Sequence, residues 1–356
     1  MSLKYTLSKK ILHFKQPAGT SRGVYTTRKI WLVELFDGEH QGVGECAPLP
    51  DLSCDAMSDE QYAALLNQFC KKLCATGEID YNAMRDYPSI LFGVETALLD
   101  LRNQLSTFNY QLSTLFDTAF SRGEVGIPIN GLVWMGNYEE MLQRMEEKLE
   151  KGFRCVKLKI GAIDFDKELD LIKKIRERFS FHEVELRLDA NGGFKYEEAL
   201  YKLELLSQYN IHSIEQPIKQ GQWAYMAELC RESPLPIALD EELIGVNDPE
   251  MKRHMLNIIK PRYIILKPSL HGGMMGCREW ISIAKDMGIG SWITSALESN
   301  IGLNAIAQFA SDVYGDNITM PQGLGTGQLF TDNIPMGLYI QDNMLFKRQS
   351  IGLNTE

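Results

Sequence analysis

A repeated alternation of short apolar runs and helical patterns, which begins near Ile127, constrains the fold of this chain more than any other feature. Segments with helical apolar spacing follow seven such runs, at 127–134, 155–160, 184–188, 211–214, 236–239, 263–266 and 290–293. Successive runs start roughly 25 to 30 residues apart, which is the length of one strand–helix unit in a (β/α)8 barrel. An eighth, weaker strand is predicted near 318–320.

The fold class predicted from this repeat is α/β, with a (β/α)7–8 barrel over 126–324. No Gly-x-Gly-x-x-Gly motif follows any of the runs, which argues against a dinucleotide-binding fold. Residues 1–125 lack this strand–helix repeat and are predicted to form an α+β capping domain, completed by the C-terminal tail 325–356.

Within the first third, the sequence predicts a β-hairpin, formed by strands at 30–36 and 42–47 around the turn Asp37-Gly38. Helical patterns follow at 59–75 and 89–104. Two segments rich in Gly, Pro, Ser, Thr and Asp, 17–28 and 48–57, are predicted to be loops. We expect these loops to close over a site in the barrel and to exclude water from it.

Charge and composition argue against nucleic acid and membranes as partners of this protein. The 37 Lys and Arg residues against 47 Asp and Glu residues give a formal net charge of −10, which argues against an electrostatic grip on nucleic acid. The sequence contains no run of about 18 apolar residues, so it predicts no membrane span. Residues 1–10 lack the apolar core of a secretion signal. The seven cysteines are scattered without zinc-type spacing. We therefore expect a cytoplasmic protein with a small-molecule partner; the sequence does not indicate its oligomeric state.

Carboxylates stand at the ends of three consecutive predicted strands, as Asp189, Glu215 and Asp240. The ends of barrel strands converge on one mouth, where the active sites of such barrels lie. Three carboxylates held together repel one another unless a cation lies between them. Oxygen ligands suit Mg²⁺, and Mn²⁺ fits the same set. Any one of these residues alone would be explained as a helix cap.

Three lysines occupy the same predicted mouth. Lys157 and Lys159 are two residues apart on one strand, so both side chains point to one face. Lys267 ends the sixth strand, across the mouth from them. Lysine is rarely buried without a partner, and each one alone would be read as a surface residue. Close to other lysines and a divalent cation, its pKa is expected to fall, which produces the neutral amine that a general base needs.

Smaller features lie beside these groups. Asn191 and Glu241 are placed to support the metal ligands, although each would equally cap a helix. Ser295 ends the seventh strand and is a candidate contact for a substrate carboxylate. The pair Gly272-Gly273 would either present backbone N–H groups to a substrate carboxylate or form a tight turn. His271 lies beyond the strand end and is the weaker candidate for a base.

Taken in order, the motifs resemble the enolase superfamily in its muconate-lactonizing-enzyme-like subgroup. They are Lys-x-Lys at 157–159, Asp-Ala-Asn at 189–191, Glu-Gln-Pro at 215–217, Asp-Glu at 240–241 and Lys267. Superfamily sites of this kind pair lysine bases with Mg²⁺. The resemblance covers most of the barrel and also implies the family's capping domain at the N-terminus.

Within that subgroup, 266–273 and 294–299 look most like the o-succinylbenzoate synthase family. That resemblance implies dehydration of 2-succinyl-6-hydroxy-2,4-cyclohexadiene-1-carboxylate to o-succinylbenzoate, a step in menaquinone biosynthesis. It implies that Lys159 takes the α-proton and then helps hydroxide to leave, and that Lys267 stabilises the anion from the opposite face. Asp189, Glu215 and Asp240 would bind Mg²⁺. Lys157 would keep Lys159 neutral or contact the substrate carboxylate.

Other activities remain open at this point. An N-succinylamino acid racemase or dipeptide epimerase of the same superfamily would use the same opposed lysines, although 316–321 lacks the Asp-x-Asp of dipeptide epimerases. The residues near Ser295 lack the His that mandelate-racemase-like members carry on strand seven. A Schiff-base aldolase built on Lys267 would leave the three carboxylates unexplained. A non-catalytic binding barrel would bind the metal without turning over a substrate.

Overall fold

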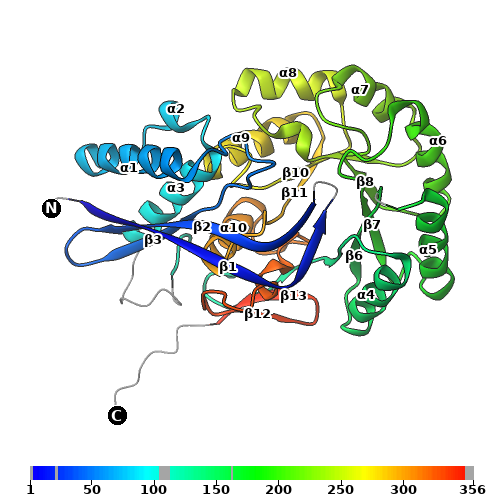
Figure 1. Ribbon diagram of the computed structural model, residues 1–356, viewed down its shortest axis with the longest axis horizontal. Helices are drawn as coiled ribbons and strands as arrows, with labels where there is room; N and C mark the ends of the chain where they lie inside the picture. Colours follow the sequence, from blue (N-terminus) through cyan, green and yellow to red (C-terminus); the bar gives the residue numbers. More distant parts are fainter. Residues whose placement is uncertain (1–2, 21–22, 104–112, 162, 349–356) are drawn as a thin grey trace, which may run out of the picture.

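Seven parallel strands curl into the barrel that the sequence predicts (Figure 1). The computed structural model describes residues 3–20, 23–103, 113–161 and 163–348. The strands run in the order β11-β10-β9-β8-β7-β6-β5. They are β5 (Gly131–Val133), β6 (Cys155–Lys159), β7 (Glu185–Asp189), β8 (Ser213–Glu215), β9 (Ile237–Leu239), β10 (Tyr263–Leu266) and β11 (Gly290–Ile293).

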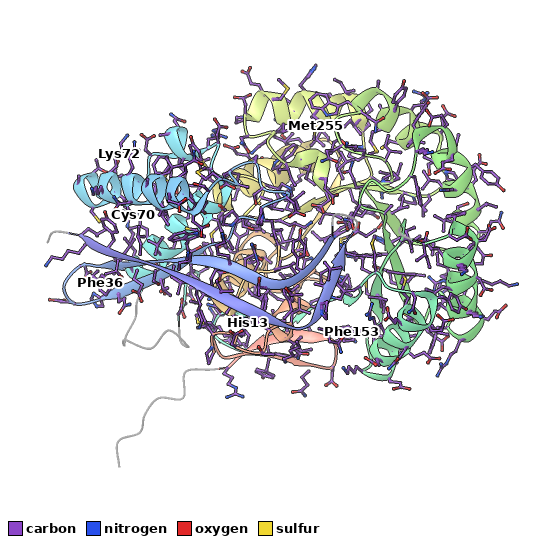
Figure 2. The ribbon with its side chains drawn as sticks, in the orientation of Figure 1. His13, Phe36, Cys70, Lys72, Phe153 and Met255 are labelled. Atoms are coloured by element: carbon purple, nitrogen blue, oxygen red, sulfur yellow. The ribbon has the colours of Figure 1, made fainter. Side chains whose placement is uncertain are left out.

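Helices cover the outside of this sheet, and in Figure 1 α4 to α8 form an outer arc around it. They are α4 (Tyr138–Glu150), α5 (Phe165–Arg178), α6 (Tyr196–Ser207), α7 (Trp223–Glu232), α8 (Pro249–Ile259), α9 (Gly273–Asp286) and α10 (Asn300–Tyr314). The side chains of Phe153 and Met255, labelled in Figure 2, belong to the large apolar core between helices and strands. None of the described helices is long and apolar enough to cross a membrane.

The eighth strand was predicted in the wrong place. Residues 318–320 form no strand; instead, isolated parallel bridges join Ile129 to Gln322 and Thr294 to Gly323. The amide of Gln322 donates to Pro128 O (2.8 Å) and that of Gly323 donates to Ile293 O (2.9 Å). The apolar signal of Ile318 instead reflects packing against the core from an irregular segment. The barrel closes through this short pairing, after Pro321.

The N-terminal unit contains an antiparallel sheet in the order β1-β2-β3. It is built from β1 (Lys4–Thr20), β2 (Gly23–Phe36) and β3 (Gln41–Cys46), with helices α1 (Asp59–Thr76), α2 (Tyr81–Met84) and α3 (Pro88–Arg102). The predicted hairpin and both predicted helices are confirmed. The loop predicted over 17–28 is wrong, since its described residues lie in β1 and β2. Their side chains are mostly exposed or half-buried, so the apolar alternation that marks a strand is weak there.

A second apolar core, separate from that of the barrel, holds the N-terminal unit together and includes Cys70, which is labelled in Figure 2. Glycines let α3 pack unusually close to β3. A Cβ atom on Gly44 would lie 1.8 Å from the carbonyl oxygen of Gly93, and one on Gly42 would lie 2.2 Å from Ala97 O. Only glycine therefore fits at these positions, and the close approach buries nearly the whole of α3.

The C-terminal segment returns to both parts of the chain. β12 (Leu338–Gln341) and β13 (Met344–Lys347) pair with β4 (Ile127–Pro128) in an antiparallel sheet. The amide of Lys15 in β1 donates to Leu329 O (2.8 Å), just after the 3-10 helix η3 (Gly325–Gln328). The division of the chain into units at 1–125, 126–324 and 325–356 stays a prediction.

Two buried carboxylates of the N-terminal unit bind the first turns of barrel helices. Glu95 on α3 accepts hydrogen bonds from the amides of Met274 (2.6 Å) and Met275 (3.0 Å) on α9. Glu45 on β3 accepts from the amides of Ser299 (2.8 Å) and Gly302 (2.9 Å) at the start of α10. Free amides at a helix N-terminus favour a negative charge. Burial nevertheless raises the pKa of Glu95 to about 8 and that of Glu45 to about 7, because the amides only partly offset the lost hydration.

These raised pKa values predict how stability depends on pH. A carboxyl group whose pKa is higher in the folded than in the unfolded state binds more protons when folded, so stability falls as pH rises from about 4.5 to about 8. We expect the free energy of unfolding in urea to fall by about 2–4 kcal/mol between pH 5 and pH 9. Glu95→Gln should flatten this dependence, whereas Glu78→Gln, at an exposed site, should not. An unchanged slope in Glu95→Gln would contradict the interpretation.

Candidate active site

The register of the parallel strands brings the predicted carboxylates together. Asp189 and Glu215 are the last residues of β7 and β8 and are direct partners in the ladder, and Asp240 follows β9. All three side chains are almost fully buried. The prediction that they converge at one end of the barrel is confirmed by this placement.

The three predicted lysines lie against these carboxylates. Lys157 Nζ is 3.0 Å from Asp189 Oδ2 and 2.8 Å from Glu215 Oε2. Lys159 Nζ reaches the same Asp189 oxygen at 2.9 Å, so the two lysines do share one face of β6. Lys267 follows β10, four strands away, and forms an ion pair with Asp240. Each ammonium group thus has a buried anionic partner.

The electrostatics of this cluster follow from burial and these pairs. Burial raises the pKa of Asp189 and of Asp240, but the adjacent lysines outweigh it, so that the pKa of Asp189 is lowered and that of Asp240 falls to about 2. Burial lowers the pKa of Lys157 and of Lys267, but the surrounding carboxylates outweigh it and raise both values. The expected lowering of the lysine pKa values depends on a bound divalent cation and stays a prediction.

Asn191 and Glu241 extend the cluster. Lys159 Nζ donates to Asn191 Oδ1 (2.7 Å), and Asn191 Nδ2 donates to Glu241 Oε1 (2.9 Å). The backbone amide of Asn191 donates to Asp189 Oδ1 (3.1 Å), with the residue in a left-handed conformation at φ 44°. Neither side chain caps a helix. Instead, they form a chain of hydrogen bonds that orients the Lys159 amine.

Among the three strand-end carboxylates, two oxygens accept no hydrogen bond from any described residue, although both are fully buried. They are Glu215 Oε1 and Asp240 Oδ1. Buried polar atoms are normally satisfied, and a cation between the two carboxylates would satisfy both oxygens. As the side chains stand, no three carboxylate, His or Cys groups in the described part of the chain enclose a metal site, because the lysine amines lie among the oxygens.

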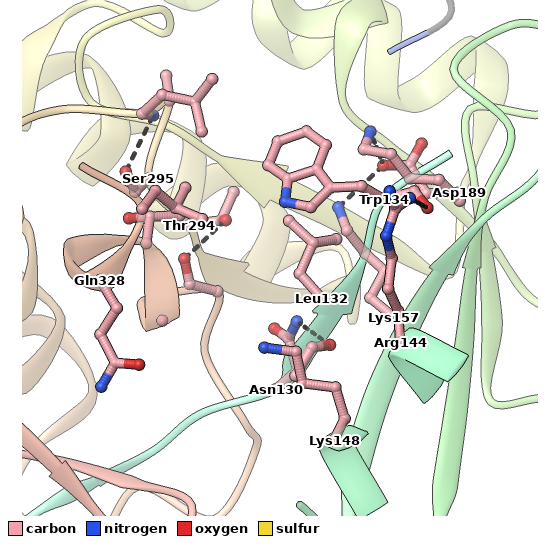
Figure 3. Close-up of a pocket in the computed structure, with 18 of the residues that line it drawn as sticks. Asn130, Leu132, Trp134, Arg144, Lys148, Lys157, Asp189, Thr294, Ser295 and Gln328 are labelled. Atoms are coloured by element: carbon pink, nitrogen blue, oxygen red, sulfur yellow. Dashed lines mark hydrogen bonds and ion pairs between the residues drawn. The ribbon is translucent and has the colours of Figure 1, made fainter. Parts of the chain in front are cut away.

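A cavity of about 610 Å³ opens beside the cluster (Figure 3). Lys157 and Asp189 lie on one side of it and Thr294 and Ser295 on the other, as Figure 3 shows. Its other lining residues include Lys159, Asn191, Lys267 and, from the N-terminal unit, Pro17, Tyr25, Leu49 and Leu52. Both segments predicted as loops, 17–28 and 48–57, thus contribute residues to the wall, although the first is not a loop.

Trp134 is a lining residue that sequence reasoning missed. Its ring centroid lies 5.9 Å from Lys159 Nζ, between the two sides of the cavity in Figure 3. It follows β5, the first strand of the barrel, so the strand-end rule that found the carboxylates would also have found it. Leu49 and Leu52 carry no such signal, because their contact with the barrel depends on how the N-terminal unit docks.

Three of the smaller candidates make contacts within the protein. The hydroxyl of Ser295 donates to buried Glu298 Oε2 (2.6 Å), so this hydroxyl already has an acceptor within the protein. His271 is fully buried, and its Nδ1 accepts from the amide of Lys267 (2.9 Å); burial lowers its pKa to about 3. Gly272 and Gly273 form the turn into α9, and the following amides bind Glu95. The anion at this helix terminus is therefore a side chain of the same protein.

The eighth strand position, at Gln322 and Gly323, carries no carboxylate, and neither do the following residues of η3. The segment 316–321, which lacks an Asp-x-Asp motif, is not the eighth strand. The eighth-strand position lacks the motif as well.

Comparison with known proteins is consistent with this geometry. Residues 140–335 match a family model described as enolase C-terminal domain-like, and 19–101 match one described as MenC, N-terminal domain. An o-succinylbenzoate synthase from Desulfotalea psychrophila is 46% identical, over 97% of this chain and 98% of the relative. The chain belongs to the o-succinylbenzoate synthase family of the enolase superfamily.

Solved structures agree with that membership. The crystal structure of MenC from Desulfotalea psychrophila LSv54 superposes with a TM-score of 0.80 at 42% identity, covering 97% of this chain and 100% of that one. A dipeptide epimerase from Cytophaga hutchinsonii, complexed with Mg and the dipeptide D-Ala-L-Val, shares the fold with a TM-score of 0.78. Its identity is 22%, over 98% of this chain and 94% of that one. The epimerase is thus the more distant of these relatives.

The contact between Ser295 and Glu298 leads to a prediction. Ser295→Ala would remove one of the hydrogen bonds to Glu298 Oε2, a buried oxygen that also accepts from the amide of Ala296 (2.7 Å). We expect a loss of about 1–3 kcal/mol in the free energy of unfolding, since a buried charged acceptor loses a hydrogen bond. Urea titration measures this loss. The control is Ser207→Ala at the C-terminal end of α6, a half-buried residue whose hydroxyl donates to the carbonyl oxygen of Glu204 in its own helix (2.7 Å). Equal stability of the Ser295→Ala and wild-type proteins would refute it.

Proposed function

We propose that this protein is a metal-dependent hydro-lyase that converts 2-succinyl-6-hydroxy-2,4-cyclohexadiene-1-carboxylate to o-succinylbenzoate, in the cytoplasm and as a step of menaquinone biosynthesis. The observation that carries the proposal is the pair Lys159 and Lys267. These lysines project into one cavity from β6 and from the end of β10, beside three buried carboxylates. The family to which the chain belongs supports the choice of substrate.

The two lysines have different roles in this reaction. Lys159 removes the proton from the ring carbon that carries the carboxylate, and a carbon–hydrogen bond breaks. The electron pair then forms the new ring double bond as the neighbouring carbon–oxygen bond breaks, and Lys159 returns the proton to the leaving hydroxide, so that water is released. Lys267, across the cavity, stabilises the negative charge of the intermediate with its ammonium group. Lys157 neutralises Asp189 and Glu215 and lies close enough to contact a substrate carboxylate.

Asp189, Glu215 and Asp240 would hold the metal, Mg²⁺ or Mn²⁺. When bound, such an ion supplies positive charge next to the substrate carboxylate, which stabilises the anion formed by proton removal. The two buried carboxylate oxygens without donors, one each on Glu215 and Asp240, support this assignment. So does the presence of Mg in the dipeptide epimerase of the same fold. A cation among the carboxylates would displace the lysine amines from them and favour the neutral amine.

The walls of the cavity suit an anionic ring compound. Leu49, Leu52 and Trp134 provide apolar surface for the ring, and lysines provide positive charge for its carboxylates. No carboxylate at Gln322 or Gly323 is available for a substrate ammonium group, which disfavours a dipeptide. Racemisation of N-succinylamino acids remains the second candidate, because these substrates are also anionic and need the same opposed lysines.

A direct assay tests the proposed function. We expect the purified protein with Mg²⁺ to convert the cyclohexadiene substrate to the aromatic product, followed by absorbance. Lys159→Ala should lower kcat by about 10²–10⁴-fold, because the general base is lost. The control Lys71→Ala, on an exposed face of α1, should keep full activity.

The opposite result is equally informative. If the folded, Mg²⁺-supplied protein does not turn over the diene, the proposed function is wrong. Deuterium exchange at the α-carbon of N-succinylamino acids would then test racemisation. Trapping of a substrate on Lys267 by borohydride would indicate a Schiff-base aldolase instead.

Metal binding is tested separately from activity. We expect Mg²⁺ to raise the melting temperature, since a ligand at 100 times its Kd stabilises the folded state by about 2.7 kcal/mol. Asp240→Asn should abolish this shift, and Asp286→Asn, at an exposed site at the end of α9, should retain it. An Asp240→Asn protein that still binds Mg²⁺ with wild-type affinity in calorimetry would contradict the ligand assignment.

A further inference from the structure

We propose that Arg28 is a positioning residue, which holds two walls of the cavity at the relative position that the substrate requires. One wall comes from the N-terminal unit after β3 and the other from the segment after β11. The proposal rests on the proposed function for the identity of the ligand. Arg28 itself does not line the cavity, so it acts through the residues it binds.

Arg28 lies in β2, and its side chain is buried, with 3% of the residue exposed. It binds carbonyl oxygens on both sides of the junction. Its Nη1 donates to Pro48 O (2.6 Å) and its Nη2 to Ala47 O. Its Nε donates to Leu297 O (3.1 Å), and Nη2 also reaches Ala296 O (3.3 Å). One planar group therefore joins 47–48 to 296–297.

The two joined segments carry residues of the cavity wall. Leu49 and Leu52 follow the first pair of carbonyl groups, while Ala296 and Leu297 belong to the second, and all four line the cavity. Leu49 and Ala296 also pack together with Leu270, three residues beyond Lys267. A shift between the segments would thus change the distance between the apolar wall and the lysine.

Each segment is internally constrained, so the Arg28 contact sets their relative position. The amide of Ser53 donates to Leu49 O (2.9 Å), and its hydroxyl accepts from the amide of Leu49 (2.8 Å). On the other side, Leu297 has a left-handed conformation at φ 68°, and its amide donates to Ser295 Oγ (3.0 Å). A left-handed leucine is strained and persists only where its surroundings hold it.

The buried positive charge has no carboxylate in contact within the described residues. Burial lowers the pKa of Arg28, and the charges of Glu298 and Glu45 oppose that effect from a greater distance. Carbonyl dipoles therefore solvate the group. The fixed planar fork of arginine can reach both segments at once, whereas the ammonium group of lysine is a single point.

Arg85 offers a matched control. It also joins the N-terminal unit to the barrel, through Glu279 (2.8 and 2.9 Å) and the carbonyl oxygen of Asn247 (2.8 Å). It is half-buried and does not line the cavity. If the arginines only hold the two parts of the chain together, KM should change in variants at both positions. If Arg28 sets the relative position of the cavity walls, KM should change only in variants at Arg28.

The experiment compares Arg28→Met, Arg28→Lys and Arg85→Met with the wild-type protein in the dehydration assay, below the melting temperature of each. We expect the KM of Arg28→Met to rise about tenfold or more, corresponding to the loss of about 1.4 kcal/mol of binding free energy. We expect kcat to change less than KM. Arg28→Lys should show an intermediate rise, and Arg85→Met should keep the wild-type KM. Affinity for o-succinylbenzoate, measured by calorimetry, should follow KM.

Chemical rescue separates positioning from simple loss of stability. Methylguanidinium, which can occupy the space left in Arg28→Ala, should lower the KM of that variant, and methylammonium should not. An unchanged KM in Arg28→Met, or an equal rise in Arg85→Met, would overturn the proposal and leave the proposed function intact. A wild-type protein that neither turns over the diene nor binds the product would overturn both.

Discussion

The sharing of one carboxylate oxygen by two lysines is the interaction on which the rest of the site depends. Asp189 Oδ2 contacts both Lys157 and Lys159, and the same ladder register places Glu215 beside them. Unpaired, each of these buried charges would be costly. The charges are tolerated because strands of one parallel sheet bring opposite charges to the same level. The cluster is therefore a direct consequence of barrel topology.

The N-terminal unit completes the site and is attached by an unusual means. Its carboxylates, Glu95 and Glu45, bind amides at the beginning of α9 and α10, helices that directly follow the strand ends near Lys267 and Ser295. The apolar wall and the lysines thus belong to one packed structure. Burial of these carboxylates costs free energy that the amides only partly return, which links the attachment of the unit to pH.

Much of the barrel could be predicted from the sequence because its strands are buried on both faces and read as continuous apolar runs. Because active sites of such barrels lie at the strand ends, the sequence then predicted Lys159, Asp189 and Lys267 as site residues. The exposed strand β1 could not be predicted in this way, because few of its side chains face a core. The pairing at Gln322 and Gly323 is too short to leave a periodic signal.

Contacts between distant parts of the chain formed a second class of feature that the sequence did not show. Glu95 lies 179 residues from Met274, and Arg28 lies 269 residues from Leu297. Nothing local in either sequence neighbourhood indicates the partner. A substrate carboxylate was one of the two interpretations of Gly272-Gly273, and in the structure a glutamate of the same chain binds the amides that follow. Helix-terminus rules predict the chemistry of a partner, not which molecule supplies it.

The division between dehydration and racemisation follows from the same reasoning. In the proposed roles, both reactions begin with removal of an α-proton by one of two opposed lysines, so Lys159 and Lys267 do not distinguish them. The difference must lie in which substrate the cavity walls place beside the lysines. Dehydration needs a ring with a leaving group on the carbon next to the reacting one, and racemisation needs an acylated amino acid. In this chain the cavity wall includes the apolar residues Leu49 and Leu52 together with an uncharged eighth-strand position. If the proposed function holds, the choice of substrate thus depends on how the N-terminal unit docks as well as on the residues in the cavity.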